Sequence, residues 1–195
     1  MEIVNTNINY TYEIMINDIN KLKKRYEFIE NGSIGYSVLG KNMPYIKIGR
    51  GVKEVLYTAA FHANEWITSV LLMKFVENFC IAYETNSDIY GYNARQIFDM
   101  TSIYLVPMVN PDGVNLVTGA GAVKENSDVY LNFKSLANNY PQIPFPSGWK
   151  ANFNGVDLKN FQHINIGATR SYINLSKFLL LHKILLISIT LSFTV

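Results

Sequence analysis

Two apolar runs on either side of one long helical pattern constrain the fold of this chain more than any other feature. Residues 55–60 (Val-Leu-Tyr-Thr-Ala-Ala) and 102–109 (Ser-Ile-Tyr-Leu-Val-Pro-Met-Val) have the composition of buried strands. Residues 67–83 between them predict an amphipathic helix. A strand, a helix and a strand in this order predict a parallel pair with a right-handed crossover. We therefore expect an α/β fold with a mixed, mostly parallel sheet flanked by helices.

The remaining segments predict helices and a hairpin around this unit. Thr11 is placed to cap a helix that runs to about Tyr26, and basic residues fill its last turns. Asn31-Gly32 predicts a break in the chain, after which two strands form a hairpin. The expected elements are strands over 33–39 and 43–48, a short helix over 94–99, a helical or loop segment over 124–139 and an extended Pro-rich loop over 140–148.

His62 and Glu65 stand where the first strand of the unit ends and its helix begins. Ligands bind at the carboxyl ends of strands in open α/β sheets. Imidazole nitrogen and carboxylate oxygen are both good zinc ligands, but a catalytic zinc needs a third protein ligand and a water. Two other interpretations stay open at this point: Glu65 favours the positive end of a helix dipole, and His62 is a core histidine.

Asn110-Pro111-Asp112-Gly113 follows the second strand and has the composition of a turn. Because the two strands are predicted to be parallel, we expect this turn at the same sheet edge as His62. It is either a structural turn or a wall of the site.

The composition excludes some classes of function. The formal charge is +2 and charged residues are 16% of the chain, so no basic patch indicates nucleic acid. The single cysteine, Cys80, lies among apolar residues of the predicted helix, which favours a buried structural thiol over a nucleophile. The N-terminus shows no basic region followed by an apolar one, so a secretory signal is not recognised and a cytoplasmic location is expected.

The chain resembles the zinc carboxypeptidase family, the carboxypeptidase A-like metallopeptidases. The resemblance rests on three motifs in order: His62 with Glu65, Asn110-Pro111-Asp112-Gly113, and Gly155-Val156-Asp157-Leu158. It covers about residues 10–158 and looks closest to bacterial γ-D-glutamyl-L-diamino acid endopeptidases, which cut cell-wall peptides. It implies a mixed eight-stranded sheet flanked by helices, one zinc ion and a peptide substrate.

The resemblance also implies roles for individual residues. His62 and Glu65 match the first two zinc ligands. Asp157 matches the carboxylate that accepts a hydrogen bond from the first histidine ligand; a turn or cap residue is the alternative. Lys150 falls where the family often has an Arg that polarises the scissile carbonyl; a solvated loop lysine is the alternative. Asn64 stands where digestive members carry a substrate-binding Arg, which puts carboxylate recognition of their type in doubt.

The sequence departs from the family pattern directly after Leu158. The family continues with Asn and often Arg-Asn, whereas this chain continues Lys-Asn-Phe-Gln. The third zinc histidine is not found: His163 follows Asp157 too closely, and His182 lies in an apolar context foreign to the family. No Asp or Glu follows Asp157, so the general base of the family is absent. We therefore expect a chain that is truncated or shifted in reading frame after Leu158, and inactive as written.

Two parts and two functions follow. Residues 1–158 are expected to be the N-terminal portion of a zinc carboxypeptidase-like catalytic domain, and 159–195 an apolar tail outside the family. Residues 178–195 suit a buried strand or helix and, alternatively, a membrane anchor. The first function is a zinc metallopeptidase acting on γ-D-glutamyl-diamino acid bonds of peptidoglycan peptides. The alternative is a non-catalytic remnant or peptide-binding module, membrane-associated through its tail.

Overall fold

The computed structural model describes residues 2–158 and 185–188, and its helices and strands alternate along the chain. In chain order they are α1 (Tyr12–Arg25), β1 (Glu30–Tyr36), β2 (Asn42–Ile48), β3 (Lys53–Thr58), α2 (Trp66–Glu84), β4 (Asp88–Ile89), β5 (Tyr92–Asn93), α3 (Ala94–Met100), β6 (Thr101–Val106), α4 (Pro111–Thr118), α5 (Asp128–Ala137) and β7 (Leu185–Ser188). A 3₁₀ turn, Ala63–Glu65, stands between β3 and α2.

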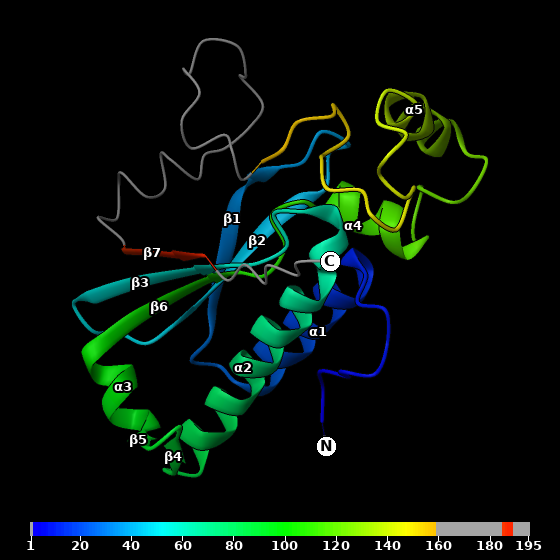
Figure 1. Cartoon of the computed structure of the whole chain (residues 1–195). Coiled ribbons are helices and arrows are strands. Elements are labelled where there is room, and N and C mark those ends of the chain that lie inside the picture. Colours follow the sequence, from blue (N-terminus) through cyan, green and yellow to red (C-terminus); the bar gives the residue numbers. More distant parts are fainter. Residues whose placement is uncertain (1, 159–184, 189–195) are drawn as a thin grey trace.

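The main sheet has the strand order β1-β2-β6-β3-β7 (Figure 1). β3 is parallel to β6 along its whole length, from the pair Lys53 and Thr101 to the pair Thr58 and Val106. In the chain, α2 follows β3 and leads through β4, β5 and α3 to β6. The predicted βαβ unit is therefore confirmed. Both strands end at the same edge of the sheet, which brings the segments after Thr58 and Val106 together.

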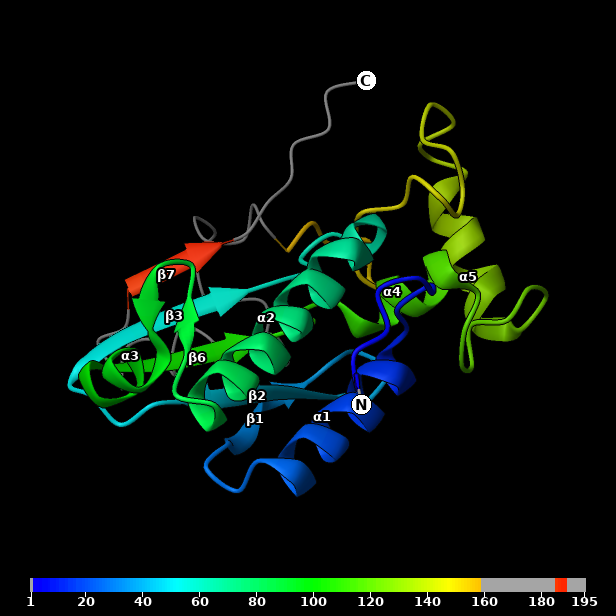
Figure 2. The ribbon, with the colours of Figure 1, turned by 90° about the horizontal axis from the view of Figure 1, so that it is seen from below.

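Helices α1 and α2 lie side by side on one face of the sheet (Figures 1 and 2). Thr11 caps α1 as predicted, because its side-chain oxygen accepts the Ile14 N–H. α2 is buried along much of its length, with Val76 and Phe79 fully enclosed. By length and composition, the helical segment Ala63–Glu84 could span a membrane. However, 56% of its most apolar stretch is buried inside the fold. Packing on the sheet therefore accounts for its apolar character.

The β1–β2 hairpin begins earlier than the sequence predicts. The expected break at Asn31-Gly32 is wrong, because both residues pair with β2, opposite Ile46 and Tyr45. A Cβ on Gly32 would lie 2.6 Å from the Tyr45 ring, so glycine is what lets that ring lie against the strand. The glycine marks a close approach inside the strand rather than its end.

The motif Asn110-Pro111-Asp112-Gly113 is not the turn that the sequence predicts; it opens α4. Asn110 caps the helix, since its side-chain oxygen accepts the Gly113 N–H at 3.1 Å. Pro111 occupies the first helical turn, where a missing N–H leaves no hydrogen bond unmade. The same residue types that favour turns thus favour a helix start here.

The second face of the sheet carries a separate apolar cluster, which includes Leu56 of β3, Tyr104 of β6 and Leu158. β7 lies at the edge of the sheet, where residues 185–188 run parallel to residues 55–58. The strand interpretation of the tail is therefore confirmed for these four positions. The rest of 178–195, and with it the anchor interpretation, lies outside the described residues.

Candidate metal centre

The chain turns sharply between β3 and α2, and this corner carries His62 and Glu65. Ala60 has a φ of 48°, which is uncommon for a residue other than glycine and redirects the chain at the end of β3. The Thr68 hydroxyl donates to the Glu65 carbonyl at 2.7 Å and accepts the Ala60 N–H at 2.9 Å. The Glu65 N–H donates to the His62 carbonyl at 3.1 Å. Both side chains therefore leave one closely hydrogen-bonded corner.

Both nitrogens of the His62 ring face carboxylates. The residue is 7% exposed; its Nδ1 lies 2.7 Å from Oε1 of Glu65, and its Nε2 lies 3.3 Å from Oδ1 of Asp157. The hydrogen bond with Glu65 raises the pKa of His62, burial opposes this rise, and the charge of Asp157 adds to it. Because the two ring nitrogens point in diverging directions, the carboxylates approach the imidazole from different sides. We call His62, Glu65 and Asp157 the metal-centre residues.

A tight turn over residues 152–156 places the Asp157 carboxylate beside the imidazole of His62. The side-chain oxygen of Asn152 accepts the N–H groups of Asn154 at 2.9 Å and Val156 at 3.1 Å. Gly155 has a φ of 75°, in the left-handed region that favours glycine. The motif Gly-Val-Asp-Leu is thus the second half of a turn organised by Asn152, and its geometry sets where the carboxylate lies.

Two backbone hydrogen bonds join the loop before this turn to the corner. The Ala63 N–H donates to the Lys150 carbonyl at 3.0 Å, and the Asn64 N–H donates to the Trp149 carbonyl at 3.1 Å. Trp149 is buried in a cluster of aromatic rings that includes Phe133, Tyr140 and Phe145. The aromatic cluster therefore anchors the loop beside the corner.

The family is decided by comparison with known proteins. A model of the family described as zinc carboxypeptidase matches residues 15–176. The chain belongs to the zinc carboxypeptidase family. It is 44% identical over 158 residues to gamma-D-glutamyl-L-diamino acid endopeptidase 1 of Lysinibacillus sphaericus, covering 81% of this chain and 39% of that protein. It is 28% identical over 116 residues to carboxypeptidase M of Mus musculus, covering 56% of this chain and 25% of that relative.

Solved metallocarboxypeptidases share the fold of this zinc carboxypeptidase chain. Bovine thrombin-activatable fibrinolysis inhibitor, in complex with tick carboxypeptidase inhibitor, matches with a TM-score of 0.53 at 17% identity, covering 75% of this chain and 38% of that chain. A metallo-carboxypeptidase from Pseudomonas aeruginosa also has a TM-score of 0.53, at 15% identity, covering 88% of this chain and 38% of that chain. At such low identity these likenesses show the fold alone. The chain spans well under two thirds of the relatives it matches.

The donor set at the corner fits part of the zinc site of this family. Nδ1 of His62 and Oε1 of Glu65 face each other across one hydrogen bond, and zinc takes these same two atom types as ligands once the proton is lost. Asp157 contacts the other ring nitrogen, so its carboxylate can orient the imidazole without sharing the metal. Within residues 2–158 and 185–188, no group of three or more His, Cys, Asp or Glu is placed to hold a metal ion. The described corner therefore brings together two side chains of the types that bind zinc, His62 and Glu65.

The other predicted residues lie around the corner without an assigned role. Lys150 is exposed, and its backbone carbonyl makes the contact with the corner, so polarisation of a substrate carbonyl by its ammonium stays a prediction. Asn64 is partly buried in the 3₁₀ turn, between His62 and Glu65. His163 and His182 lie outside the described residues.

Asn110 contacts the corner, in a motif that the sequence left as either a structural turn or a wall of the site. It is 2% exposed, and its Nδ2 donates to the carbonyls of Phe61 and Lys150, both at 3.3 Å. The signal that was available is the Asn-Pro pair, which is typical of a helix start as well as of a turn. Reading the pair as a helix cap predicts a helix that starts at this edge of the sheet.

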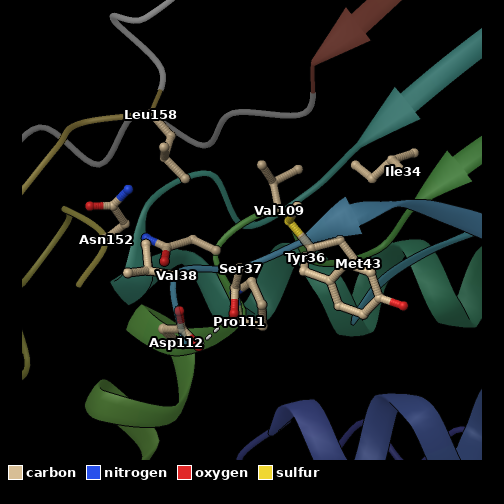
Figure 3. Close-up of a pocket in the computed structure, with 11 residues that line it drawn as sticks. Ile34, Tyr36, Ser37, Val38, Met43, Val109, Pro111, Asp112, Asn152 and Leu158 are labelled. Carbon is tan, nitrogen blue, oxygen red and sulfur yellow. Dashed lines mark hydrogen bonds between the residues drawn. The ribbon is translucent and has the colours of Figure 1, made fainter. Parts of the chain in front are cut away.

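A small pocket lies beside Asn110, between the β1–β2 hairpin and residues 152–158 (Figure 3). At its edge the buried Asp112 accepts the Ser37 hydroxyl at 2.9 Å and the Leu39 N–H at 3.0 Å, and so ties the hairpin to α4. Burial raises the pKa of Asp112, and these two hydrogen bonds oppose the rise. The pocket has a volume of about 20 Å³, comparable with one water molecule, and its described lining does not include the metal-centre residues. It is too small to be a peptide cleft.

Proposed function

We propose that this chain carries the first two zinc ligands and the orienting carboxylate of a metallopeptidase active site of the carboxypeptidase type. The observation that carries the proposal is the held imidazole: Glu65 contacts one ring nitrogen of His62, and Asp157 contacts the other. A carboxylate on the second nitrogen fixes the tautomer and the ring orientation in which the first nitrogen binds a metal. A histidine that serves packing alone has no need of two carboxylates.

The substrate we propose is a peptidoglycan peptide, cleaved at a γ-D-glutamyl-diamino acid bond. The support is the 44% identity, over 81% of this chain, to an endopeptidase named for that bond. Zinc, when bound, supplies a Lewis acid and an acidified water. His62 and Glu65 would hold it, Asp157 would keep the Nε2 proton on the ring, and Lys150 is the proposed cation near the scissile carbonyl.

We further propose that the 195-residue chain by itself does not catalyse this hydrolysis. The reaction needs a carboxylate that takes a proton from the attacking water and passes it to the leaving amine. No Asp or Glu follows Asp157 in the sequence, and within the described residues no third metal-binding side chain joins His62 and Glu65. Two protein ligands are expected to hold zinc weakly.

Zinc affinity and turnover, measured on the same preparations, test both statements. The 195-residue chain and its His62→Ala and His182→Ala variants are titrated with zinc in competition with a chromogenic chelator, then incubated with a γ-D-glutamyl-diamino acid peptide. We expect weak zinc binding that depends on His62 and not on His182, and no cleavage. Zinc binding that survives His62→Ala contradicts the ligand assignment. Cleavage that His62→Ala abolishes contradicts the proposed inactivity, and weaker zinc binding in His182→Ala identifies a third ligand.

A non-catalytic peptide-binding module is the second candidate, and the two-ligand corner of the described residues favours it. It predicts that the peptide binds without turnover, as measured by isothermal titration calorimetry.

The proposed membrane association through 178–195 is tested by partitioning into vesicles with and without that segment, and a full chain that stays out of the vesicles contradicts it. The cytoplasmic location also stays a prediction.

A further inference from the structure

We propose that Asn110 is a positioning residue, which holds the loop at Lys150 against the His62 corner and so keeps Asp157 at the imidazole. The inference rests on the proposed zinc site, because it concerns how that site is kept in shape. The side chain of Asn110 joins three segments: the residue before His62, the start of α4 and the loop that leads to Asp157.

Both ends of the Asn110 amide are used inside the protein. Nδ2 has two hydrogens, and it donates to the carbonyl of Phe61 and to the carbonyl of Lys150, each at 3.3 Å. Oδ1 accepts the Gly113 N–H at 3.1 Å. The Asn110 backbone N–H donates to the Ala60 carbonyl at 2.9 Å. The backbone of Asn110 is therefore tied to the segment after β3, while its side chain contacts that segment, the start of α4 and the loop.

The Lys150 carbonyl is the atom at which these contacts meet. It accepts the Ala63 N–H at 3.0 Å as well as the Asn110 amide. Because Ala63 directly follows His62, the same oxygen links the corner, Asn110 and the loop. Loss of the Asn110 donor leaves the loop held to the corner by its two backbone hydrogen bonds and by the packing of Trp149, and a shift of the loop carries Asp157 away from the ring.

The first turn of α4 packs closely against Asn110 and the corner. A Cβ on Gly113 would lie 2.6 Å from Cβ of Ala63 and 2.7 Å from Nδ2 of Asn110. The first turn of α4 therefore approaches the corner as closely as a glycine allows. A side chain between them must be short, and it must accept a hydrogen bond at one atom and donate two at another, which only the Asn amide does in this space.

Two substitutions separate the capping role of Asn110 from its positioning role. Ser and Asp are both good N-cap residues, so Asn110→Ser and Asn110→Asp keep an acceptor for the Gly113 N–H but lack the NH₂ group that donates to Phe61 and Lys150 together. The first variant is neutral and smaller, whereas the second is isosteric and charged, so an effect common to both is due to neither size nor charge. Asn115→Ser is the matched control, since Asn115 of the same helix also accepts and donates, but toward Tyr12 and Glu13.

The measurement is amide hydrogen exchange in the full chain without metal, reported as the exchange rate of Ala63 divided by that of Gly113 in the same protein. The ratio cancels any change in global stability, because global unfolding exposes both amides. We expect the ratio to rise about tenfold in Asn110→Ser and in Asn110→Asp, the change that follows when one buried hydrogen bond is weakened. It is expected to stay at the parent value in Asn115→Ser. A ratio within about twofold of the parent in either Asn110 variant overturns the inference.

Zinc binding gives the second readout and separates this inference from the proposed function. Substitutions that disturb the support of a metal ligand weaken metal affinity about 10–100-fold, so we expect about tenfold weaker zinc binding in Asn110→Ser and no change in Asn115→Ser. Unchanged zinc affinity together with a raised exchange ratio overturns the positioning role. If the parent chain binds no zinc, the proposed function fails, and the exchange ratio alone then decides whether Asn110 holds the loop.

Discussion

Glu77 of α2 is a buried carboxylate that holds the N-terminal segment onto the fold, and its replacement by Gln tests the energetics of that contact. The residue is 0% exposed. Its carboxylate accepts the Ile3 N–H at 2.5 Å, the Val4 N–H at 3.2 Å and the Lys74 ammonium at 2.9 Å. Glu77→Gln keeps the shape of the side chain and removes its charge.

The expected loss follows from these three contacts. A hydrogen bond to a charged group contributes about 1.5–3 kcal/mol, and a neutral one about 1 kcal/mol. The Gln amide accepts at one atom only and turns an NH₂ group toward a donor, so one bond is weakened and another is lost. The contact with Lys74 contributes at the lower end of the charged range, because the Lys74 side chain is 25% exposed and its ammonium also contacts Glu2. We expect the free energy of unfolding to fall by about 2–3 kcal/mol.

Urea unfolding at neutral pH, followed by tryptophan fluorescence, measures this loss. With an m value of about 2–3 kcal/mol/M, the midpoint falls by about 1 M. Glu84→Gln is the matched control on the same helix. The Glu84 carboxylate is 52% exposed and lies 3.8 Å from Arg25, so its removal is expected to change the free energy of unfolding by no more than about 0.5 kcal/mol.

The pH dependence provides an independent check. Burial alone would raise the pKa of Glu77, but its three hydrogen-bond donors outweigh burial and hold the pKa below the usual 4.5. A carboxylate whose pKa is lowered by folding stabilises the fold fully above its unfolded pKa, and this contribution is lost as the pH falls through the folded pKa. The difference in the free energy of unfolding between the parent and Glu77→Gln is therefore greatest at neutral pH and becomes smaller below about pH 4.5. Two results refute the reasoning: a loss of unfolding free energy in Glu77→Gln no larger than that in Glu84→Gln, or a stability difference from the parent that persists in acid.

Three further substitutions or reagents probe the site and the core. Asp157→Asn keeps the size of the side chain but removes the carboxylate from His62 Nε2, so zinc affinity measured by chelator competition is expected to fall about 10–100-fold. Gly49→Ala is expected to destabilise the fold more than Gly91→Ala in urea: both glycines have positive φ, but only at Gly49 does the new Cβ meet a backbone carbonyl, at 2.0 Å. Cys80 is enclosed, and burial raises the pKa of its thiol, so a thiol reagent is expected to label it only after denaturation.

The parallel βαβ unit was predictable from sequence because its pattern is set by burial. Apolar runs over 55–60 and 102–109 have no polar face, as expected of strands covered on both sides, and they became β3 and β6. Their parallel pairing then places the residues after each strand at one sheet edge. The nearness of His62 to the Asn-Pro-Asp-Gly motif follows from this pairing alone.

The predictions were wrong at Gly32 and at Asn110, because glycine and asparagine each suit more than one local structure. Gly32 was expected to end a segment, yet it lies inside β1, where the Tyr45 ring needs the space of a missing Cβ. Asn110 was expected in a turn, yet it caps α4. For Gly32 the deciding contact comes from Tyr45, which is distant in sequence and leaves no local pattern. Asn110 caps α4 through the Gly113 N–H, three residues further on, so the Asn-Pro pair did carry a local signal for the helix start.

The register of β3 against β6 determines which residue can hold the site together. The pairing continues past the ends of both strands: the Ala59 N–H donates to the Val106 carbonyl at 3.0 Å, and the Asn110 N–H donates to the Ala60 carbonyl at 2.9 Å. This places Asn110 beside the residue two positions before His62, within reach of both the Phe61 carbonyl and the loop. A slip of one residue in a strand pair turns every side chain to the opposite face. The motifs in the sequence therefore name the groups proposed to bind or orient a metal, whereas the residue proposed to keep them in position is set by register and emerges only when the strands are paired.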